Sequence, residues 1–300
     1  MQRLTVEHTT VYRYRRPVKF GPHRLMFRPR ESHDLQLLDS RLIIRPTARV
    51  HWLYDVFSNS VAIADFKEPA SELHFESVVV LDRYPYEAPN FRIERYARTL
   101  PFSYPVREVP DLGRTIERHY PDPDRQLIDW TRQRLAGNGD MATEEFLIGI
   151  TRDIKKSFRY ELRQEPGVQS PLETLKRGAG SCRDYALFMM EAVRSVGLAA
   201  RFVSGYLYDS AIDGKAAGVV GAGATHAWVQ VYLPGAGWVE FDPTNGSYGG
   251  TNLIPVAVAR EPAQAMPVSG TYQGGPEDFI EMQVVVAVRS ADVSMPDDQG

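Results

Sequence analysis

The chain has 300 residues, 43% of them hydrophobic, which is enough for one large or two medium domains with a substantial core. Its formal net charge of −3 argues against a general nucleic-acid binder, so we expect no nucleic-acid partner. A single cysteine allows neither an intramolecular disulfide nor a zinc site built from thiolates, and it favours a reducing cytoplasm. No signal-peptide segment opens the chain and no stretch approaches the roughly 18 apolar residues of a membrane span, so the sequence predicts a cytoplasmic protein with no membrane partner.

The first third of the chain predicts an antiparallel β-sandwich, which we assign to residues 1–105. Short β-rich segments recur there, separated by clusters of Pro, Ser and Asp, at residues 4–14, 37–44, 50–57, 61–66 and 73–80. Strands of this length with such turn signals are typical of sandwiches. Repeated prolines between residues 84 and 120 indicate a linker or a wrapping segment.

The rest of the chain predicts a mixed domain over residues 106–289, and the whole is therefore expected to be an α+β protein. Helices are expected at residues 125–135 and 143–157 and from Cys182 onward. Strands are expected at residues 200–208, 224–233, 238–242, 253–259 and 279–288. Residues 290–300, which include Pro-Asp-Asp, are predicted to form a disordered tail.

Cys182 lies in the run Gly-Ala-Gly-Ser-Cys-Arg-Asp at residues 178–184. Ser181 precedes a helical apolar pattern, and Asp184 lies three residues after Ser181. This spacing is a capping-box pattern. Cys182 is thus expected at the first turn of a helix, where unpaired N–H groups and the helix dipole favour a thiolate. Taken alone, a single cysteine is more often a buried structural residue.

His226 and Asp242 are expected to meet across a β-hairpin. The turn Pro-Gly-Ala-Gly at residues 234–237 separates two short strand patterns, and an antiparallel return brings Asp242 back beside His226. An Asp there accepts a hydrogen bond from one ring nitrogen and leaves the other for the thiol. Singly, the histidine fits a satisfied half-buried residue and the aspartate fits a strand-end turn residue. The three groups together favour a nucleophile, a base and an orienting carboxylate.

These residues also resemble a known family. Residues 180–184 (Gly-Ser-Cys-Arg-Asp), 226–228 (His-Ala-Trp), Trp238 and 241–244 (Phe-Asp-Pro-Thr) resemble the core motifs of the transglutaminase-like superfamily, whose fold is related to papain-like cysteine proteases. Weaker motifs resemble the bacterial transglutaminase-like N-terminal region, at residues 8–14, 17–18, 23–25, 28–30 and 55–59. Ser58 stands where glycine is expected. The resemblance implies a Cys182, His226 and Asp242 triad and chemistry on amides.

The sequence therefore predicts a cysteine-nucleophile amide hydrolase, a cysteine protease in type, which acts on peptide, isopeptide or glutamine amides through a thioester. The backbone N–H of Cys182 is one expected oxyanion donor, and Tyr160 is the candidate for the second. Two alternatives stay open: a protein-glutamine amine transferase, and a binding or scaffold protein without turnover. We expect a protein or peptide substrate and no cofactor or metal, and the oligomeric state is left open.

Several other features have competing interpretations. The glycine-rich stretch 209–223 fits a loop that borders the cleft or a disordered surface insertion. Arg201 and Asp184 are expected to be structural. A basic run is either a stripe for an anionic partner or a solvated strand face, at Arg13, Arg15, Arg16, Lys19, Arg24, Arg28 and Arg30.

Overall fold

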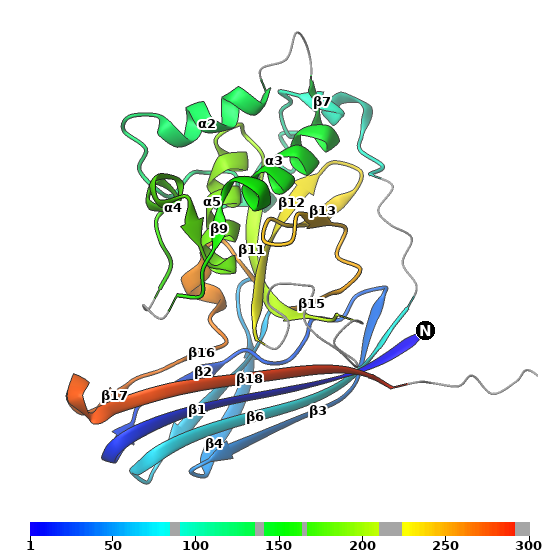
Figure 1. Cartoon of the computed structure of the whole chain (residues 1–300). Coiled ribbons are helices and arrows are strands. Elements are labelled where there is room, and N and C mark those ends of the chain that lie inside the picture. The colour runs from blue at the N-terminus through cyan, green and yellow to red at the C-terminus, as the bar shows by residue number, and fades with distance from the viewer. Residues whose placement is uncertain (85–90, 136–140, 164–166, 210–223, 292–300) are drawn as a thin grey trace, which may run out of the picture.

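Two antiparallel sheets form the N-terminal sandwich, which occupies the lower half of Figure 1. One sheet has the order β17-β1-β6-β3 with β18 also paired to β1, and the other has the order β16-β2-β5-β4. The computed structural model describes residues 1–84, 91–135, 141–163, 167–209 and 224–291. The N-terminal strands are β1 (Gln2–Phe20), β2 (His23–Leu25), β3 (Leu35–Arg45), β4 (Ala48–Tyr54), β5 (Ser60–Phe66) and β6 (Ala70–Arg83).

The apolar faces of these strands meet inside the sandwich. Burial alternates along β6, as a strand with one covered face requires. Leu73 and Phe75 of β6 pack there against Ala62 and Ala64 of β5 and against Leu25 of β2. The predicted α+β class with an N-terminal antiparallel sandwich is confirmed.

The end of the chain returns to complete this sandwich. β16 (Val268–Ser269) pairs with β2, whereas β17 (Tyr272–Gln273) and β18 (Phe279–Ala291) both pair with β1. The sequence analysis assigned residues 106–289 to the second domain, whereas β16, β17 and β18 pair with strands of the sandwich. A local sequence pattern does not show which sheet a strand joins. Of the predicted disordered tail, Ser290 and Ala291 are the last residues of β18, and the remainder lies outside the described residues.

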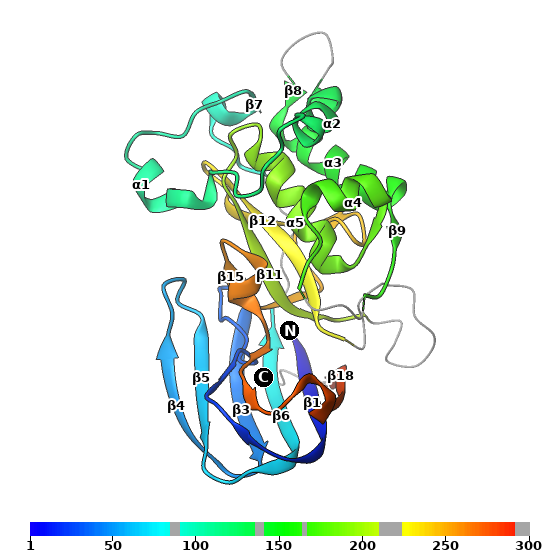
Figure 2. The ribbon, with the colours of Figure 1, turned by 90° about the vertical axis from the view of Figure 1, so that its left-hand side faces the viewer.

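A third antiparallel sheet, called here the core sheet, lies above the sandwich with the order β14-β13-β12-β11-β15. Helices cover one of its faces, while β15 and β11 reach down to the sandwich (Figures 1 and 2). Its strands are β11 (Ala200–Leu207), β12 (His226–Leu233), β13 (Gly237–Asp242), β14 (Ser247–Tyr248) and β15 (Leu253–Ala259). The helices are α2 (Gln126–Leu135), α3 (Thr143–Ser157), α4 (Pro171–Arg177) and α5 (Cys182–Arg194).

Helix α5 is the centre of this unit. Its residues Ala186, Met189 and Val193 are fully buried, as are Val229 and Val231 of β12, and all belong to one hydrophobic cluster. Burying side chains of this size contributes about 1.5–3 kcal/mol each relative to exposure. The position of the helix start, and so of Cys182, is therefore set by packing along the whole helix.

Residues 91–120 wrap over the core unit, and they contain α1 (Val109–Leu112). The hydroxyl of Tyr104 ties this segment down by donating to the carbonyl of Tyr232 at 2.9 Å and accepting from the N–H of Ala199 at 2.8 Å. The remaining short elements are η1 (Arg95–Ala97), β7 (Thr99–Leu100), η2 (Gly113–Thr115), β8 (Met141–Ala142), β9 (Arg159–Tyr160), β10 (Ala179–Gly180), η3 (Pro262–Ala265) and η4 (Pro276–Asp278).

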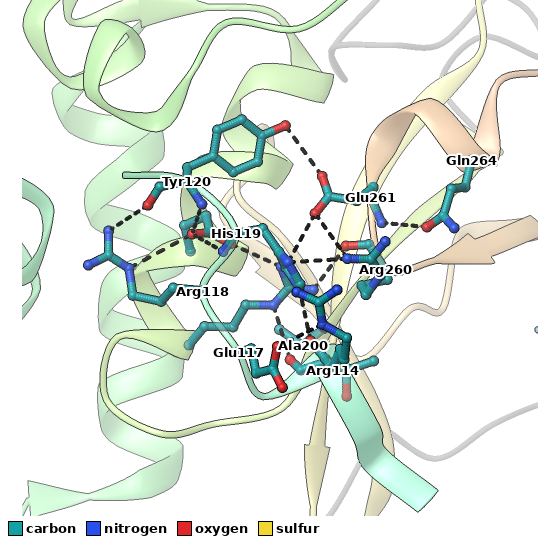
Figure 3. A network of polar contacts seen from close by, with 12 residues as sticks. Arg114, Glu117, Arg118, His119, Tyr120, Ala200, Arg260, Glu261 and Gln264 are labelled. Atoms are coloured by element: carbon teal, nitrogen blue, oxygen red, sulfur yellow. Dashed lines mark hydrogen bonds and ion pairs between the residues drawn. The ribbon is translucent and has the colours of Figure 1, made fainter. Parts of the chain in front are cut away.

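A buried ionic network holds the end of α5. Glu191 and Arg194 are both fully buried at their side chains and pair at 3.0 Å. Glu191 also accepts from the backbone N–H groups of His119 and Tyr120. Figure 3 shows how residues 114–120 lie there against Arg260. Each charged group thus has partners, which a buried charge requires.

A buried histidine connects the two units. His8 of β1 is 1% exposed, and its Nδ1 lies 2.9 Å from the hydroxyl of Tyr206 of β11. Its Nε2 lies 2.9 Å from the Oγ1 of Thr10. Burial lowers the pKa of His8 to about 4, so the ring is neutral at physiological pH.

Within the described residues, no helix combines the length and apolarity needed to cross a bilayer.

Candidate active site

The start of α5 is built around Asp184. Its Oδ2 accepts from both the backbone N–H and the hydroxyl of Ser181 at 2.8 Å. A carboxylate in the first turn satisfies unpaired N–H groups and fits the positive end of the helix. Asp184 is itself fully buried and also binds Arg163 at 3.0 Å and the N–H of Gln169 at 2.7 Å. The loop before α4 is thereby fixed to the turn that carries Cys182, and Asp184 has the structural role expected of it.

Gly180 is required by this arrangement. A Cβ at residue 180 would lie 2.9 Å from the Cβ of Asp184, closer than side chains approach. Gly180 also pairs in parallel with Tyr160 of β9, and its carbonyl accepts from the N–H of Glu161 at 2.9 Å. The backbone before Cys182 and the strand that carries Tyr160 are therefore held side by side.

The structure brings His226 and Asp242 together. Nε2 of His226, the first residue of β12, lies 2.8 Å from Oδ2 of Asp242, the last residue of β13. The hairpin register pairs Val229 with Phe241, so the two side chains are diagonal neighbours on one face. Both are buried, at 1% and 0% exposure.

The turn after β13 fixes the carboxylate of Asp242. The N–H of Thr244 donates to Oδ1 at 2.9 Å, and the amide Nδ2 of Asn245 donates to Oδ2 at 2.7 Å. Sequence reasoning missed Asn245. The run Asp-Pro-Thr-Asn does indicate the turn, because an aspartate side chain commonly binds the backbone N–H two residues on, and Asn245 directly follows that residue.

The protonation of the histidine follows from its neighbours. Burial lowers the pKa of His226, but the carboxylate of Asp242 and then the Cys182 side chain outweigh burial and raise that pKa to about 10. Burial conversely raises the pKa of Asp242, whereas His226 and Asn245 lower it, and the net effect is a lowered pKa. The pair is therefore an imidazolium and a carboxylate at neutral pH.

Cys182 stands between His226 and Tyr160. Nδ1 of His226 is buried without a hydrogen bond to a described residue, and the interaction with Cys182 helps to raise the pKa of its ring. Burial, followed by the charge and hydrogen bond of Cys182, raises the pKa of Tyr160. The phenol of Tyr160 thus stays protonated and available as a donor beside the sulfur. Cys182 is 7% exposed.

A tryptophan closes the site from the core side. The ring of Trp228 lies 5.9 Å from that of His226 at an interplanar angle of 27°, and it is fully buried. Gly205 pairs with His226 across β11, and a Cβ there would meet the Trp228 ring at 2.8 Å and the carbonyl of Ile254 at 2.1 Å. The histidine is therefore held by an aromatic wall that only a glycine at residue 205 admits.

Other sequence expectations have mixed outcomes. Of the stretch 209–223, only Asp209 belongs to the described residues, and residues 210–223 lie outside them. Among the described residues, no group of three or more His, Cys, Asp or Glu is placed to hold a metal ion. Within the basic run, Arg13, Arg16 and Arg24 form ion pairs with carboxylates, which favours a neutralised strand face over a positive stripe.

Comparisons with known proteins agree with this architecture. Residues 131–243 match the family model described as the transglutaminase-like superfamily, and residues 4–82 match that of the bacterial transglutaminase-like N-terminal region. The first match contains all three candidate residues.

Relatives align over nearly the whole chain. An uncharacterized protein of Mycobacterium leprae is 27% identical, with 96% of this chain and 99% of that protein covered. An uncharacterized protein of Mycobacterium tuberculosis is 26% identical, with coverages of 95% and 92%. The crystal structure of a Cytophaga hutchinsonii protein named "Putative Cysteine Protease" superposes with a TM-score of 0.70 at 17% identity, covering 98% of this chain and 92% of that one. The chain therefore carries a domain of the transglutaminase-like superfamily at residues 131–243 and the bacterial transglutaminase-like N-terminal region at residues 4–82.

Proposed function

We propose that the protein is a cysteine-nucleophile amide hydrolase in which Cys182, His226 and Asp242 are the nucleophile, the acid–base group and the orienting carboxylate. The observation that carries the proposal is the 2.8 Å contact between Nε2 of His226 and Asp242, which leaves Nδ1 free toward the thiol at the start of α5. A nucleophile, a base and an orienting carboxylate in contact form a functional unit on many folds, whatever their order along the chain.

The proposed reaction has two halves. The thiolate of Cys182 attacks the carbonyl carbon of an amide, and the carbonyl electron pair moves to oxygen. His226 then donates its Nδ1 proton to the leaving nitrogen, the C–N bond breaks, and an amine departs from a thioester. Water attacks the thioester while Nδ1 takes its proton, and the C–S bond breaks to release a carboxylic acid product. The imidazolium and thiolate are then restored.

The oxyanion of each half-reaction needs donors near the sulfur. The backbone N–H of Cys182 has no intrahelical acceptor, because it lies at the first residue of α5. The hydroxyl of Tyr160 is the second proposed donor, supported by its interaction with Cys182 and by the raised pKa that keeps it protonated. Donors of this kind typically contribute a factor of about 100 to 1,000 in rate.

Hydrolysis is preferred to amine transfer because water is always present as an acceptor, and the name of the Cytophaga hutchinsonii protein agrees with this choice. The test incubates the full chain with a library of peptide, isopeptide and glutamine amides together with a labelled primary amine. New carboxylates without label support hydrolysis, whereas incorporation of label would assign amine transfer instead.

Cys182→Ala is the matched control for this assay. The proposal expects that the variant releases no new carboxylate and incorporates no label. Turnover that persists in Cys182→Ala would contradict the role of the thiol. A folded wild-type protein whose Cys182 shows only the reactivity of an ordinary thiol would favour the binding-protein alternative.

A further inference from the structure

A cavity of about 550 Å³ lies at the junction of the N-terminal sandwich and the core sheet, and it is lined by neither Cys182, His226 nor Asp242. The sandwich contributes Arg30 and Arg83, and the core sheet contributes Arg201, Gln230 and Trp238. Its volume falls in the range of sites for small organic ligands, roughly 300–1,000 Å³. Figure 1 shows this junction between the core sheet and the sandwich, below β11 and β13.

Four arginines converge on the cavity, since Arg92 also lines it. Among the described residues, none of the four guanidinium groups lies within the 4.0 Å ion-pair distance of a carboxylate. Burial, together with the positive charge of Arg30, lowers the pKa of Arg201 to about 9. Four cations held close together without ion pairs leave a positive site that an anion would relieve.

The acidic residues of the cavity offset only part of this positive charge, although the charge of Glu240 stabilises both Arg83 and Arg201. Glu31, Asp34 and Glu240 line it, but the Oε1 of Glu240 accepts from Nε2 of Gln230 at 3.0 Å. Burial raises the pKa of Glu240 to about 7, and the neighbouring Gln230 and Trp228 side chains oppose that rise. Glu240 is therefore only partly ionised near physiological pH.

Two of the arginines, Arg201 and Arg83, are held in place by contacts within the protein. Nε of Arg201 donates to Oε1 of Gln230 at 2.7 Å, and its guanidinium carbon lies 4.1 Å from the centre of the Trp238 ring. These contacts leave its two terminal nitrogens for a ligand. Arg83 is 8% exposed, its terminal nitrogens bind the carbonyls of Thr251 and Leu253, and its buried Nε has no hydrogen-bond partner among the described residues.

We propose that this cavity is a binding site for a small organic polyanion that carries carboxylate or phosphate groups, with Arg201 and Arg92 as its main contacts. Planar guanidinium groups bind both kinds of oxyanion through paired N–H donors. The ring of Trp238 and the amide of Gln230 fix the direction of the Arg201 fork. The site is independent of the proposed reaction, because it uses none of the triad residues.

The experiment measures binding of citrate and of inorganic pyrophosphate to the full chain by titration calorimetry at low salt, with glycerol as the uncharged control. We expect saturable binding of at least one anion and none of glycerol. Arg201→Met and Arg92→Gln should each weaken that binding at least ten-fold. Arg49→Gln is the matched control, since Arg49 is exposed on β4 and does not line the cavity.

The outcomes separate the two ligand chemistries and the two proposals of function. Binding of citrate alone assigns carboxylates, and binding of pyrophosphate alone assigns phosphates. Cys182→Ala should bind as the wild type does, so an inactive enzyme leaves this result unchanged. No saturable binding of either anion would overturn the site. If Arg92→Gln and a folded Arg201→Met protein both bound the anion with wild-type affinity, that result would also overturn the site.

Discussion

The chemistry of the candidate site depends on a few side chains whose partners are fixed. Asp242 receives donors from His226, Thr244 and Asn245, so its carboxylate has one orientation. That orientation determines which nitrogen of His226 carries the Asp-bound proton and which one faces Cys182. The histidine–aspartate pair could be predicted from the hairpin pattern, whereas the contacts of Asp184 with Arg163 and Gln169 could not, because no short-range signal links them.

Asp242→Asn should lower amide turnover by about 1,000 to 10,000-fold, because an amide neither stabilises the imidazolium nor fixes the tautomer. The measurement is the initial rate on the best amide found in the library. Asn245→Ala is the matched control, since it removes only one of the donors to Asp242, and we expect a much smaller loss. Equal losses in the two variants would contradict the role of Asp242.

Tyr160→Phe should lower the turnover number about 100-fold with little change in the Michaelis constant, because it removes a donor needed only by the oxyanion. The ring remains, so its contact with Tyr185 at 6.3 Å is preserved. The check is steady-state kinetics beside a thermal unfolding curve. An unchanged turnover number would remove Tyr160 from the mechanism.

At the scale of elements, α5 connects the site to the rest of the core. The capping pattern at Ser181 and Asp184 and the apolar period from Ala186 onward predicted where this helix begins and which face it buries. Its C-terminal anchor could not be predicted, because Glu191 meets residues 119–120 only after the chain has folded. The short helix α4 was missed as well, since its seven residues are too few for a clear period.

Glu191→Gln should lower the free energy of unfolding by about 3 kcal/mol, because it leaves the buried Arg194 without its charge partner. The measurement is equilibrium denaturation with urea. Glu117→Gln is the matched control, as Glu117 pairs with Arg114 at the exposed edge of the same network (Figure 3). A folded Glu191→Gln protein should keep the reactivity of Cys182. The same urea midpoint in Glu191→Gln and Glu117→Gln would contradict the role of Glu191 in anchoring the end of α5.

At the scale of the whole molecule, the C-terminal strands return to the sandwich, and the contact of His8 with Tyr206 joins the two units. The recurring short β-rich segments of the first third, separated by Pro, Ser and Asp clusters, predicted the sandwich, and helical patterns predicted α2, α3 and α5. The return of β16, β17 and β18 to the sandwich could not be foreseen, because pairing partners as far apart in the chain as Leu4 and Ser290 leave no local trace. The arginine cavity was missed for the same reason, since its residues come from distant segments.

His8 should make the stability of the folded protein depend on pH. The folded state keeps the ring neutral down to a pKa of about 4, whereas the unfolded chain takes up a proton near the ordinary value of 6.5. Stability is therefore lost as pH falls from about 6.5 toward 4, by up to about 3 kcal/mol. His8→Gln should lack this term, so the stability gap between wild type and variant should shrink on acidification. A gap that is constant between pH 7 and pH 4.5 would be the contrary result.

The central claim, that Cys182 is an activated nucleophile beside His226, is tested most directly by alkylation with iodoacetamide at pH 6.5, which needs no knowledge of the substrate. Rates are measured by mass spectrometry for wild type, His226→Asn and each protein unfolded in urea. The account predicts that folded wild type reacts at least about ten-fold faster than folded His226→Asn and faster than its own unfolded thiol. Equal rates in the two folded proteins, or a folded wild-type thiol slower than the unfolded one, would contradict it.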